Sequence, residues 1–323
     1  MTAPLRPLRL GTRASALAMT QSGHVADALR ERLGREVELV EVTTHGDVSR
    51  APLAQIGGTG VFVSALRDAL LAGEVDLAVH SLKDLPTTPA DGIALAAVPP
   101  REDSRDVVIA RDGLTLGELP VGSRVGTGSP RRAAQLAALG LGLEIVPIRG
   151  NVDTRIGKIA AGEVDAVLLA RAGLARLGRV DEVTEVIDPF QMLPAPGQGA
   201  LAVECRSDDV SLVEALSVLD DPATRAAVTA ERAVLATLEA GCSAPVGALG
   251  EVVEGDDDEE LWVRAVVLSL DGALSIRMSA TGSPGDAFGV GSRLGQEMLA
   301  DGAADLMEGP QPGGPDRVGE QHA

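Results

Sequence analysis

The order of patterns along the 323 residues predicts an α/β protein with two similar units and a smaller α+β unit at its end. In the first two thirds, short apolar runs alternate with stretches of helical spacing, which is typical of a largely parallel sheet with helices on both faces. This alternation restarts after Pro99–Asp106, a segment rich in charge and proline that we interpret as a crossing between units. After a second Pro- and Gly-rich crossing, Leu193–Ala200, three strands and a helix predict the third unit.

The first unit is expected to contain three strands and two helices. The strands are predicted at Leu8–Gly11, Glu36–Thr43 and Val75–His80, and the helices at Ser15–Leu33 and Val61–Leu71. Gly34 follows the first helix, and glycine readily adopts the left-handed conformation with which many helices end.

The second unit repeats this order and leads into the third. Its strands are predicted at Val107–Ala110, Arg124–Gly126, Glu144–Ile148 and Asp165–Ala170, with helices that begin at Pro130 and near Val152. A strand, Leu201–Cys205, and a long helix, Pro222–Glu239, come next. The third unit has predicted strands at Val246–Val253, Leu261–Leu270 and Ser275–Thr281 and a helix at Pro284–Ala300. We interpret the acidic run Glu254–Glu260 as a solvated hairpin loop, and the residues from Gly309 onward as a disordered tail.

Charge is distributed unevenly along the chain, whose formal net charge is −19. Residues 1–200 contain 21 basic and 24 acidic side chains, whereas residues 201–323 contain 7 and 23. Nucleic-acid binding needs a basic face and usually aromatic stacking platforms, and this chain has no Tyr, one Trp and three Phe. We therefore expect no nucleic-acid partner, and any anion binding must be local.

Nothing in the sequence predicts export, a membrane span or a metal site. Arginines interrupt every apolar stretch near the amino terminus, and nowhere do 18 apolar residues run together. The two cysteines, Cys205 and Cys242, have no zinc-type spacing and form no disulfide framework. We expect a cytoplasmic protein with reduced thiols and no metal.

The stretch VGTGSPRRAAQL, Val125–Leu136, has the strongest signal for ligand binding. Ser129 suits a helix N-cap and Pro130 the first helical position, which puts Arg131 and Arg132 in the first turn. Arginine is unfavourable there because the amino-terminal end of a helix is positive. A bound anion would reverse that penalty. The alternative is a solvated helix start whose arginines pair with neighbouring acids.

The next junction of strand and helix, PIRGNVDTR, repeats this theme with Arg149 and Arg155. Open α/β sheets bind ligands at the carboxyl ends of their strands. Between Arg124 and Arg176 there are eight basic and four acidic residues, a local excess of positive charge in an acidic protein. Because arginine binds carboxylates through two hydrogen bonds, a ligand with several carboxylates is favoured. Phosphate is the competing ligand, but no Walker sequence is present.

Two further candidates follow strands of the first unit. In AVHSLKDLPTT, Lys83 and Asp84 come directly after an apolar strand, and Arg13 and Ser15 follow the first strand. An Asp in such a place is more often a turn former. Facing a cleft lined with arginines, however, it could stabilise a cationic intermediate and move protons.

The two cysteines lie in different contexts. Cys205 alternates with apolar residues like a strand core residue, so we interpret it as a buried structural thiol. Cys242 lies in LEAGCSAPVG, on a short Gly-flanked loop after the long helix, where it could be a nucleophile or an attachment point. An ordinary small loop residue is the alternative there.

Taken together, LGTRASALA, TTHGD, GGTGVFVSAL, AVHSLKDLPT, VGTGSPRRAAQL, IRGNVDTR, LPAPGQGALAVECR and AERAVLATLEAGCSAPVGA resemble the porphobilinogen deaminases, also called hydroxymethylbilane synthases. The resemblance implies two domains similar to periplasmic binding proteins and a small C-terminal α+β domain that carries the cofactor cysteine. It implies a transferase of tetrapyrrole (haem) biosynthesis that joins four porphobilinogen molecules into hydroxymethylbilane and releases ammonia. Chain growth takes place on a dipyrromethane primer.

The family's motifs assign roles to residues of this chain. They imply that Cys242 carries the dipyrromethane as a thioether and that Asp84 is catalytic. The residues implied to hold the cofactor are Cys242, Lys83, Asp84, Thr127, Ser129, Arg131, Arg132 and Arg155. The residues implied to hold porphobilinogen or its linear oligomers are Arg13, Ser15, Phe62, Arg149, Arg155, Arg176 and Gln198. The chain departs from many family members at Gln55 and Thr59, where these have lysines.

The resemblance also implies domain boundaries. Domain 1 would comprise residues 1–101 with 197–219, domain 2 residues 102–196, the C-terminal domain residues 220–308, and the tail 309–323. We expect a monomer whose loop 44–60 is mobile. The alternatives are a non-catalytic anion-binding protein on the same two-lobed fold, and a cysteine-dependent transferase, for which no activating base is found near Cys242.

Overall fold

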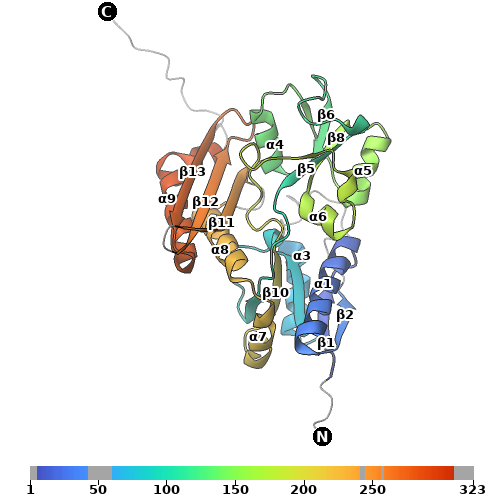
Figure 1. The fold of residues 1–323 in the computed structure, drawn as a ribbon, viewed down its shortest axis with the longest axis vertical. Helices are drawn as coiled ribbons and strands as arrows, with labels where there is room; N and C mark the ends of the chain where they lie inside the picture. Colours follow the sequence, from blue (N-terminus) through green and yellow to red (C-terminus); the bar gives the residue numbers. More distant parts are fainter. Residues whose placement is uncertain (1–5, 43–59, 241–243, 256–257, 309–323) are drawn as a thin grey trace, which may run out of the picture.

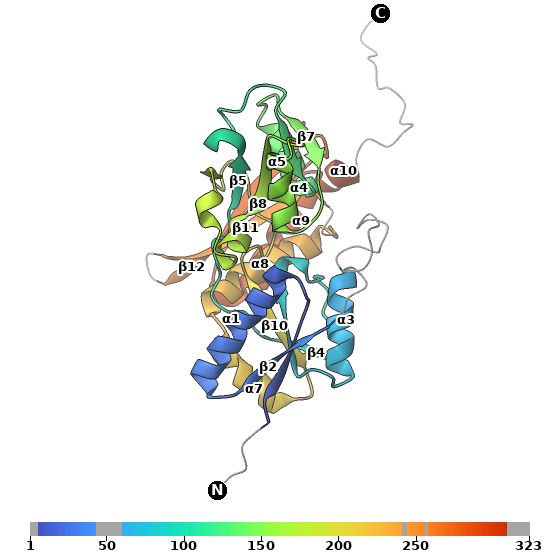
Figure 2. The same cartoon turned by 90° about the vertical axis from the view of Figure 1, so that its right-hand side faces the viewer.

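The computed structural model describes residues 6–42, 60–240, 244–255 and 258–308 (Figure 1). These residues form two five-stranded sheets and one three-stranded sheet, each with helices packed against it. The predicted fold class is therefore confirmed. Figure 2 shows the second lobe above the first, with the third sheet and its helices against both.

The first lobe is built on a sheet of order β2-β1-β3-β10-β4. Its strands are β1 (Leu8–Thr12), β2 (Val37–Glu41), β3 (Leu77–Ser81), β4 (Ile93–Ala97) and β10 (Leu201–Arg206). Helices α1 (Ala16–Leu33) and α7 (Val210–Leu216) cover one face, and α3 (Gly60–Leu71) covers the other. Strand β10 arrives from beyond the second lobe and pairs antiparallel with both β3 and β4.

The second lobe has a sheet of order β7-β6-β8-β5-β9. Its strands are β5 (Asp106–Ala110), β6 (Arg124–Thr127), β7 (Glu144–Pro147), β8 (Ala166–Ala170) and β9 (Glu185–Val186). Helix α4 (Pro130–Ala138) packs on one face, and α5 (Val152–Ala160) and α6 (Arg171–Arg176) pack on the other.

The third unit is a three-stranded antiparallel sheet with helices on one face. Its strands are β11 (Val246–Glu254), β12 (Glu259–Leu268) and β13 (Ser275–Gly282), and its helices are α8 (Pro222–Thr237), α9 (Ala287–Ala300) and α10 (Ala303–Glu308). Its other face packs partly on the second lobe, where Leu249 and Val266 share a buried cluster with Ala134 of α4.

Most predicted elements lie within a few residues of the observed ones, and four details were wrong. The sheets are less parallel than expected, because β10 and β5 both run antiparallel to their neighbours. Strands β4 and β9 and helices α6, α7 and α10 were not predicted. The acidic run is a hairpin as expected, but Glu254 pairs with Glu259, so the strands extend into it. The start of the predicted helix at Pro284 is a 3₁₀ turn that precedes α9.

Local sequence explains the helix starts that matter for the site. Ser15 caps α1 by accepting a hydrogen bond from the Ala18 N–H at 3.3 Å. Ser129 caps α4 in the same way at the Arg132 N–H, and Pro130 occupies the first turn. Both caps follow the carboxyl end of a strand, so both helices begin at the edges of the sheets where ligands bind in open α/β folds.

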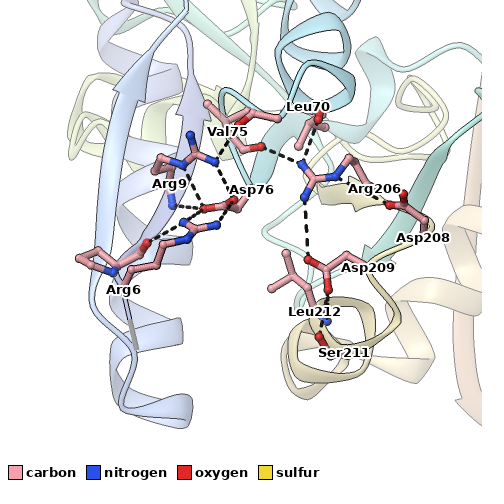
Figure 3. Close-up of polar contacts among 12 residues, drawn as sticks. Arg6, Arg9, Leu70, Val75, Asp76, Arg206, Asp208, Asp209, Ser211 and Leu212 are labelled. Carbon is pink, nitrogen blue, oxygen red and sulfur yellow. Dashed lines mark hydrogen bonds and ion pairs between the residues drawn. The ribbon is translucent and has the colours of Figure 1, made fainter. Parts of the chain in front are cut away.

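The opposite end of the first sheet is fixed by ion pairs (Figure 3). Asp76, directly before β3, accepts hydrogen bonds from the guanidinium groups of Arg6 and Arg9. Burial alone would raise the pKa of Asp76, but these two arginines hold it well below its usual range. The amino ends of β1 and β3 are thereby held together, far from the strand ends that carry the candidate site.

The two crossings between the lobes touch each other and are joined to the third unit by one buried carboxylate. Arg101, in the first crossing, forms an ion pair with Glu231 of α8 at 2.5 Å and donates to the Gln198 carbonyl in the second crossing at 2.8 Å. Glu231 is fully buried and also accepts from the N–H groups of Gly197 and Gly250. At Gly199, with φ +89°, an added Cβ would lie 2.3 Å from the Glu102 carbonyl oxygen. Only glycine permits this close approach of the crossings.

We predict that Glu231→Gln lowers the free energy of unfolding by about 3–5 kcal/mol, because it leaves Arg101 buried without its counter-charge. Urea unfolding followed by circular dichroism measures this. Glu297→Gln, an exposed change in α9 of the same unit, is the control and should cost less than about 0.5 kcal/mol. Equal stabilities of the two variants would contradict the importance of the pair.

Candidate active site

Lys83 and Asp84 lie on a short 3₁₀ turn, Leu82–Asp84, that follows β3 directly. The turn is fixed because the Leu82 side chain is fully buried and its N–H donates to the Ala200 carbonyl of the second crossing at 3.0 Å. Both Lys83 and Asp84 are half-buried. The two crossings, Pro99–Asp106 and Leu193–Ala200, together form the hinge between the lobes. This hinge therefore supports the turn that carries these two side chains.

Arg131 and Arg132 at the start of α4 are buried, which the sequence did not predict. Both form ion pairs with Asp106 at the start of β5, at 2.7 Å from Arg131 and 2.8 Å from Arg132. Arg131 also donates to the Leu193 carbonyl, and Arg132 to the Leu168 carbonyl. The expected pairing with an acid is thus present, but it occurs inside the protein instead of at a solvated helix start.

Gln198 connects this cluster to the turn that carries Lys83 and Asp84. Its Nε2 donates to Asp106 Oδ1 at 2.7 Å, and its Oε1 accepts from Lys83 Nζ at 3.3 Å. Gln198 is itself buried in the second crossing. Residues from the first lobe, the hinge and the second lobe therefore meet at one place.

The charges at this place shift the pKa values of its members. Burial and the nearby Arg132 lower the pKa of Lys83 to about 8, against the opposing effects of Asp84 and Asp106. Burial alone would raise the pKa of Asp106, but Arg131 and Arg132 hold it well below its usual range. The site thus keeps one strongly ionised acid among several cations.

Arg155 and Arg149 extend the positive region. Helix α5 begins at an Asn151 cap, and the Arg155 Nε donates to the Gly150 carbonyl at 2.9 Å. The pKa of Arg155 is lowered by burial and by repulsion from Arg132 and Arg149. The structure therefore brings the arginines of two successive helix starts close enough to repel one another, and a bound anion would relieve that repulsion.

The other predicted site residues lie at varied places. Thr127 is buried at the end of β6 and accepts from the Ser129 N–H at 3.2 Å. Arg13 and Ser15 follow β1 and are half-buried. Arg176, at the end of α6, donates to the Gly199 carbonyl at 2.6 Å, so it is bound to the hinge. This contact therefore lies at the second crossing and not at the Arg132 cluster.

Some predicted residues cannot be compared with the structure. Cys242, Gln55, Thr59 and the rest of loop 44–59 lie outside the described residues. Phe62 lies in α3, but its side chain is outside the description as well. Cys205 is fully buried in β10, as expected for a structural thiol, and burial raises its pKa to about 11.

Asp106 is the site residue that the sequence analysis missed. Its signal was an acidic residue directly before the apolar run VVIA, in a strand that is buried along its whole length. A buried acid needs a cationic partner, and the two adjacent arginines of α4 were the available ones.

The donor set suits a ligand that carries several carboxylates. Lys83, Arg131, Arg132, Arg149 and Arg155 supply positive charge, and Asp106 and Asp84 balance only part of it. The buried Arg131 Nε has no hydrogen-bond partner among the described residues. Within the same described residues, no cluster of His, Cys, Asp and Glu could hold a metal ion.

Comparison with known proteins decides which family this site belongs to. Residues 8–214 match the family model "Porphobilinogen deaminase, dipyromethane cofactor binding domain", and residues 225–300 match "Porphobilinogen deaminase, C-terminal domain". The chain belongs to the porphobilinogen deaminase family. As a member, it is a transferase of tetrapyrrole biosynthesis, a hydroxymethylbilane synthase, and it has the domain that binds the dipyrromethane cofactor. The alternative of a non-catalytic anion-binding protein is not favoured.

Individual relatives agree with this membership. The chain is 61% identical over 311 residues to porphobilinogen deaminase 1 of Streptomyces coelicolor, covering 94% of this chain and 98% of that protein. It is 60% identical over 307 residues to porphobilinogen deaminase of Mycobacterium tuberculosis, covering 94% and 99%. Among solved structures, a periplasmic substrate-binding protein of an ABC transporter from Coxiella burnetii is similar, with 15% identity, a TM-score of 0.41, and coverage of 70% of this chain and 96% of that one.

Membership in the porphobilinogen deaminase family also names the substrate, because its members act on porphobilinogen. In the ranges 6–42, 60–240, 244–255 and 258–308, no helix combines the length and apolar character needed to span a bilayer.

We predict that Lys83→Met raises the free energy of unfolding at pH 7 by about 1–2 kcal/mol, because burying an ammonium group is unfavourable. Between pH 8 and its ordinary pKa of 10.5, the unfolded chain holds more protons at Lys83 than the folded chain. The penalty is therefore complete below about pH 8 and disappears as the pH rises toward 10.5.

The measurement is urea unfolding at several pH values, in a Cys242→Ala background so that bound cofactor does not contribute. Lys158→Met, which removes the other lysine of the chain from its pairing with Glu163, is the control. A stability difference at Lys83 that stays constant from pH 7 to pH 10 would refute the lowered pKa.

Proposed function

We propose that Asp84 is the catalytic carboxylate of this hydroxymethylbilane synthase and that Cys242 carries its dipyrromethane primer. The observation that supports this most is the convergence of the Lys83–Asp84 turn with the buried cluster of Arg131, Arg132 and Asp106. A substrate with several carboxylates can be held there while its pyrrole lies next to an acid.

The arginines and Lys83 act as binding groups. When bound, dipyrromethane supplies the pyrrole to which new units are added, and each of its rings bears an acetate and a propionate. Lys83, Arg131, Arg132 and Arg155 hold these carboxylates, together with the Ser129 hydroxyl and the N–H groups at the start of α4. Thr127 and Gln198 support them by the hydrogen bonds to Ser129, Lys83 and Asp106.

Asp84 stabilises the positive charge that develops on the substrate during the reaction. Each addition joins the aminomethyl carbon of porphobilinogen to a pyrrole and releases ammonia, so positive charge develops on pyrrole rings. A carboxylate beside the pyrrole N–H stabilises that charge and can accept a proton. Arg13, Ser15, Phe62 and Arg149 are proposed to hold the incoming unit or the growing chain. Arg176, given its bond to the Gly199 carbonyl, contributes through the hinge.

We further propose the domain boundaries given by the family's pattern, with domain 1 at residues 1–101 and 197–219, domain 2 at 102–196 and the C-terminal domain at 220–308. The pairing of β10 with β3 and β4 supports the discontinuous first domain. We propose that the protein is a cytoplasmic monomer, since it makes a tetrapyrrole precursor from a small molecule. Size-exclusion chromatography with light scattering tests the monomer.

We predict that the purified protein is heavier than its sequence mass by two linked pyrrole units, and that it gives the Ehrlich colour reaction of pyrroles in acid. Cys242→Ala should lack both the added mass and the colour. Cys205→Ala, which removes the buried thiol of β10, is the matched control and should keep both. Active protein with the bare sequence mass would rule out the covalent cofactor.

We predict that Asp84→Ala lowers the rate of hydroxymethylbilane formation by at least about 10²-fold, because the developing charge loses its counter-ion. The variant should keep the mass of the bound cofactor and its thermal unfolding temperature, since Asp84 is half-buried and its turn is held by Leu82. Asp91→Ala, an exposed change in the same lobe, is the control. Near-normal product formation by Asp84→Ala would remove Asp84 from the mechanism.

A further inference from the structure

A buried cluster of charged side chains, Glu204, Arg67 and His80, lies between α3 and the first sheet, beside the strand that leads to Asp84. The proposed function does not use it. Glu204 of β10 accepts two hydrogen bonds from the Arg67 guanidinium of α3, at 2.6 and 3.0 Å. Its Oε2 lies 3.3 Å from the Nε2 of His80 of β3. The side chains of Glu204 and His80 are only 3% and 5% exposed, and that of Arg67 is 16% exposed.

The strand register explains why these three side chains meet. Ala78 of β3 pairs with Glu204, and His80 pairs with Ala202, so His80 and Glu204 lie on the same face of the sheet. Helix α3 covers that face, where Leu66 and Leu70 pack against Ala78. Arg67 reaches the cluster from this helix.

Packing alone does not require charge at this position. A buried ion pair often contributes no more stability than apolar side chains of the same volume would, because desolvation offsets the attraction. What such a pair can supply is a fixed geometry. Burial alone would raise the pKa of Glu204, but His80 and Arg67 lower it to about 2, so the carboxylate is ionised and bound on both sides.

The cluster fixes the part of β3 next to the catalytic turn. His80 precedes Asp84 by one short turn of chain, and the intervening Ser81 and Leu82 are held by backbone bonds to β10 and Ala200. The Gln198 amide holds Lys83 from the side of the hinge. The contact of the His80 imidazole with Glu204, on the face covered by α3, holds the end of β3 at a second point.

We propose that His80 is a positioning residue for Asp84, with its imidazole held by Glu204, which Arg67 orients in turn. This inference rests on the proposed role of Asp84. Loss of the imidazole and of its contact with Glu204 lets the end of β3 shift, which moves the Asp84 carboxylate away from the reacting pyrrole. The carboxylate-binding arginines lie on the other lobe and are unaffected.

The test compares His80→Phe, which keeps a ring of similar size, with His80→Gln, whose amide can still donate to Glu204. We expect His80→Phe to lower kcat about tenfold or more while KM for porphobilinogen stays within about twofold. His80→Gln should recover most of kcat. Intact mass should show the full cofactor in both. His24→Phe, a change at the exposed histidine of α1, is the control and should leave kcat and KM unchanged.

Two outcomes would overturn the proposal. One is a normal kcat for His80→Phe, and the other is an equal loss in His80→Phe and His80→Gln, which would mean that the packing of the side chain matters instead of its polar contact with Glu204. If His80→Phe does not fold, Arg67→Gln decides, because it removes the two hydrogen bonds that orient Glu204 while leaving a side chain that can still donate to it. The proposal requires a lowered kcat with unchanged KM there as well. Failure of the parent protein to form hydroxymethylbilane would instead refute the proposed function itself.

Discussion

Two arginines can be buried side by side at the start of α4 because Asp106 lies between them and pairs with both. Without that carboxylate, the two charges would repel each other in a region from which water is excluded. The same carboxylate accepts a hydrogen bond from Gln198, which joins Lys83, and the Gln198 carbonyl accepts from Arg101, which joins Glu231 of α8. One connected set of polar groups therefore runs from α8 through the hinge to the turn that carries Lys83 and Asp84.

This network explains how an acidic protein can bind an acidic substrate. The excess of negative charge lies in the last third of the chain, where most of the acidic side chains that the structure describes are exposed. The binding cations lie in the first two thirds, close enough to one another to lower the pKa values of Lys83 and Arg155. Their mutual repulsion makes carboxylate binding favourable at this place.

The sequence predicted the fold class and most of the strands, because apolar runs and strand ends depend on local pattern. Lys83, Asp84, Arg131, Arg132 and Arg155 were found because each follows the end of a strand. Strand direction was harder, since β5 and β10 run antiparallel to their neighbours for reasons that lie in the crossings between the lobes. Asp106, Glu231 and Glu204 were missed because the arginines that pair with them are 26 to 137 residues away in the chain. The role of Cys242 stays a prediction.

The bonds of Arg101 to both the second crossing and α8 have a mechanical consequence. A rotation of one lobe against the other would turn about the point where the crossings meet, and Arg101 binds Glu231 at that point. Such a rotation would therefore displace the part of α8 around Glu231 less than the distant parts of either lobe. A group attached to the chain after α8 would then move little when the lobes rotate. A pyrrole chain attached there would extend its reach mainly by gaining units and less through movement of the lobes.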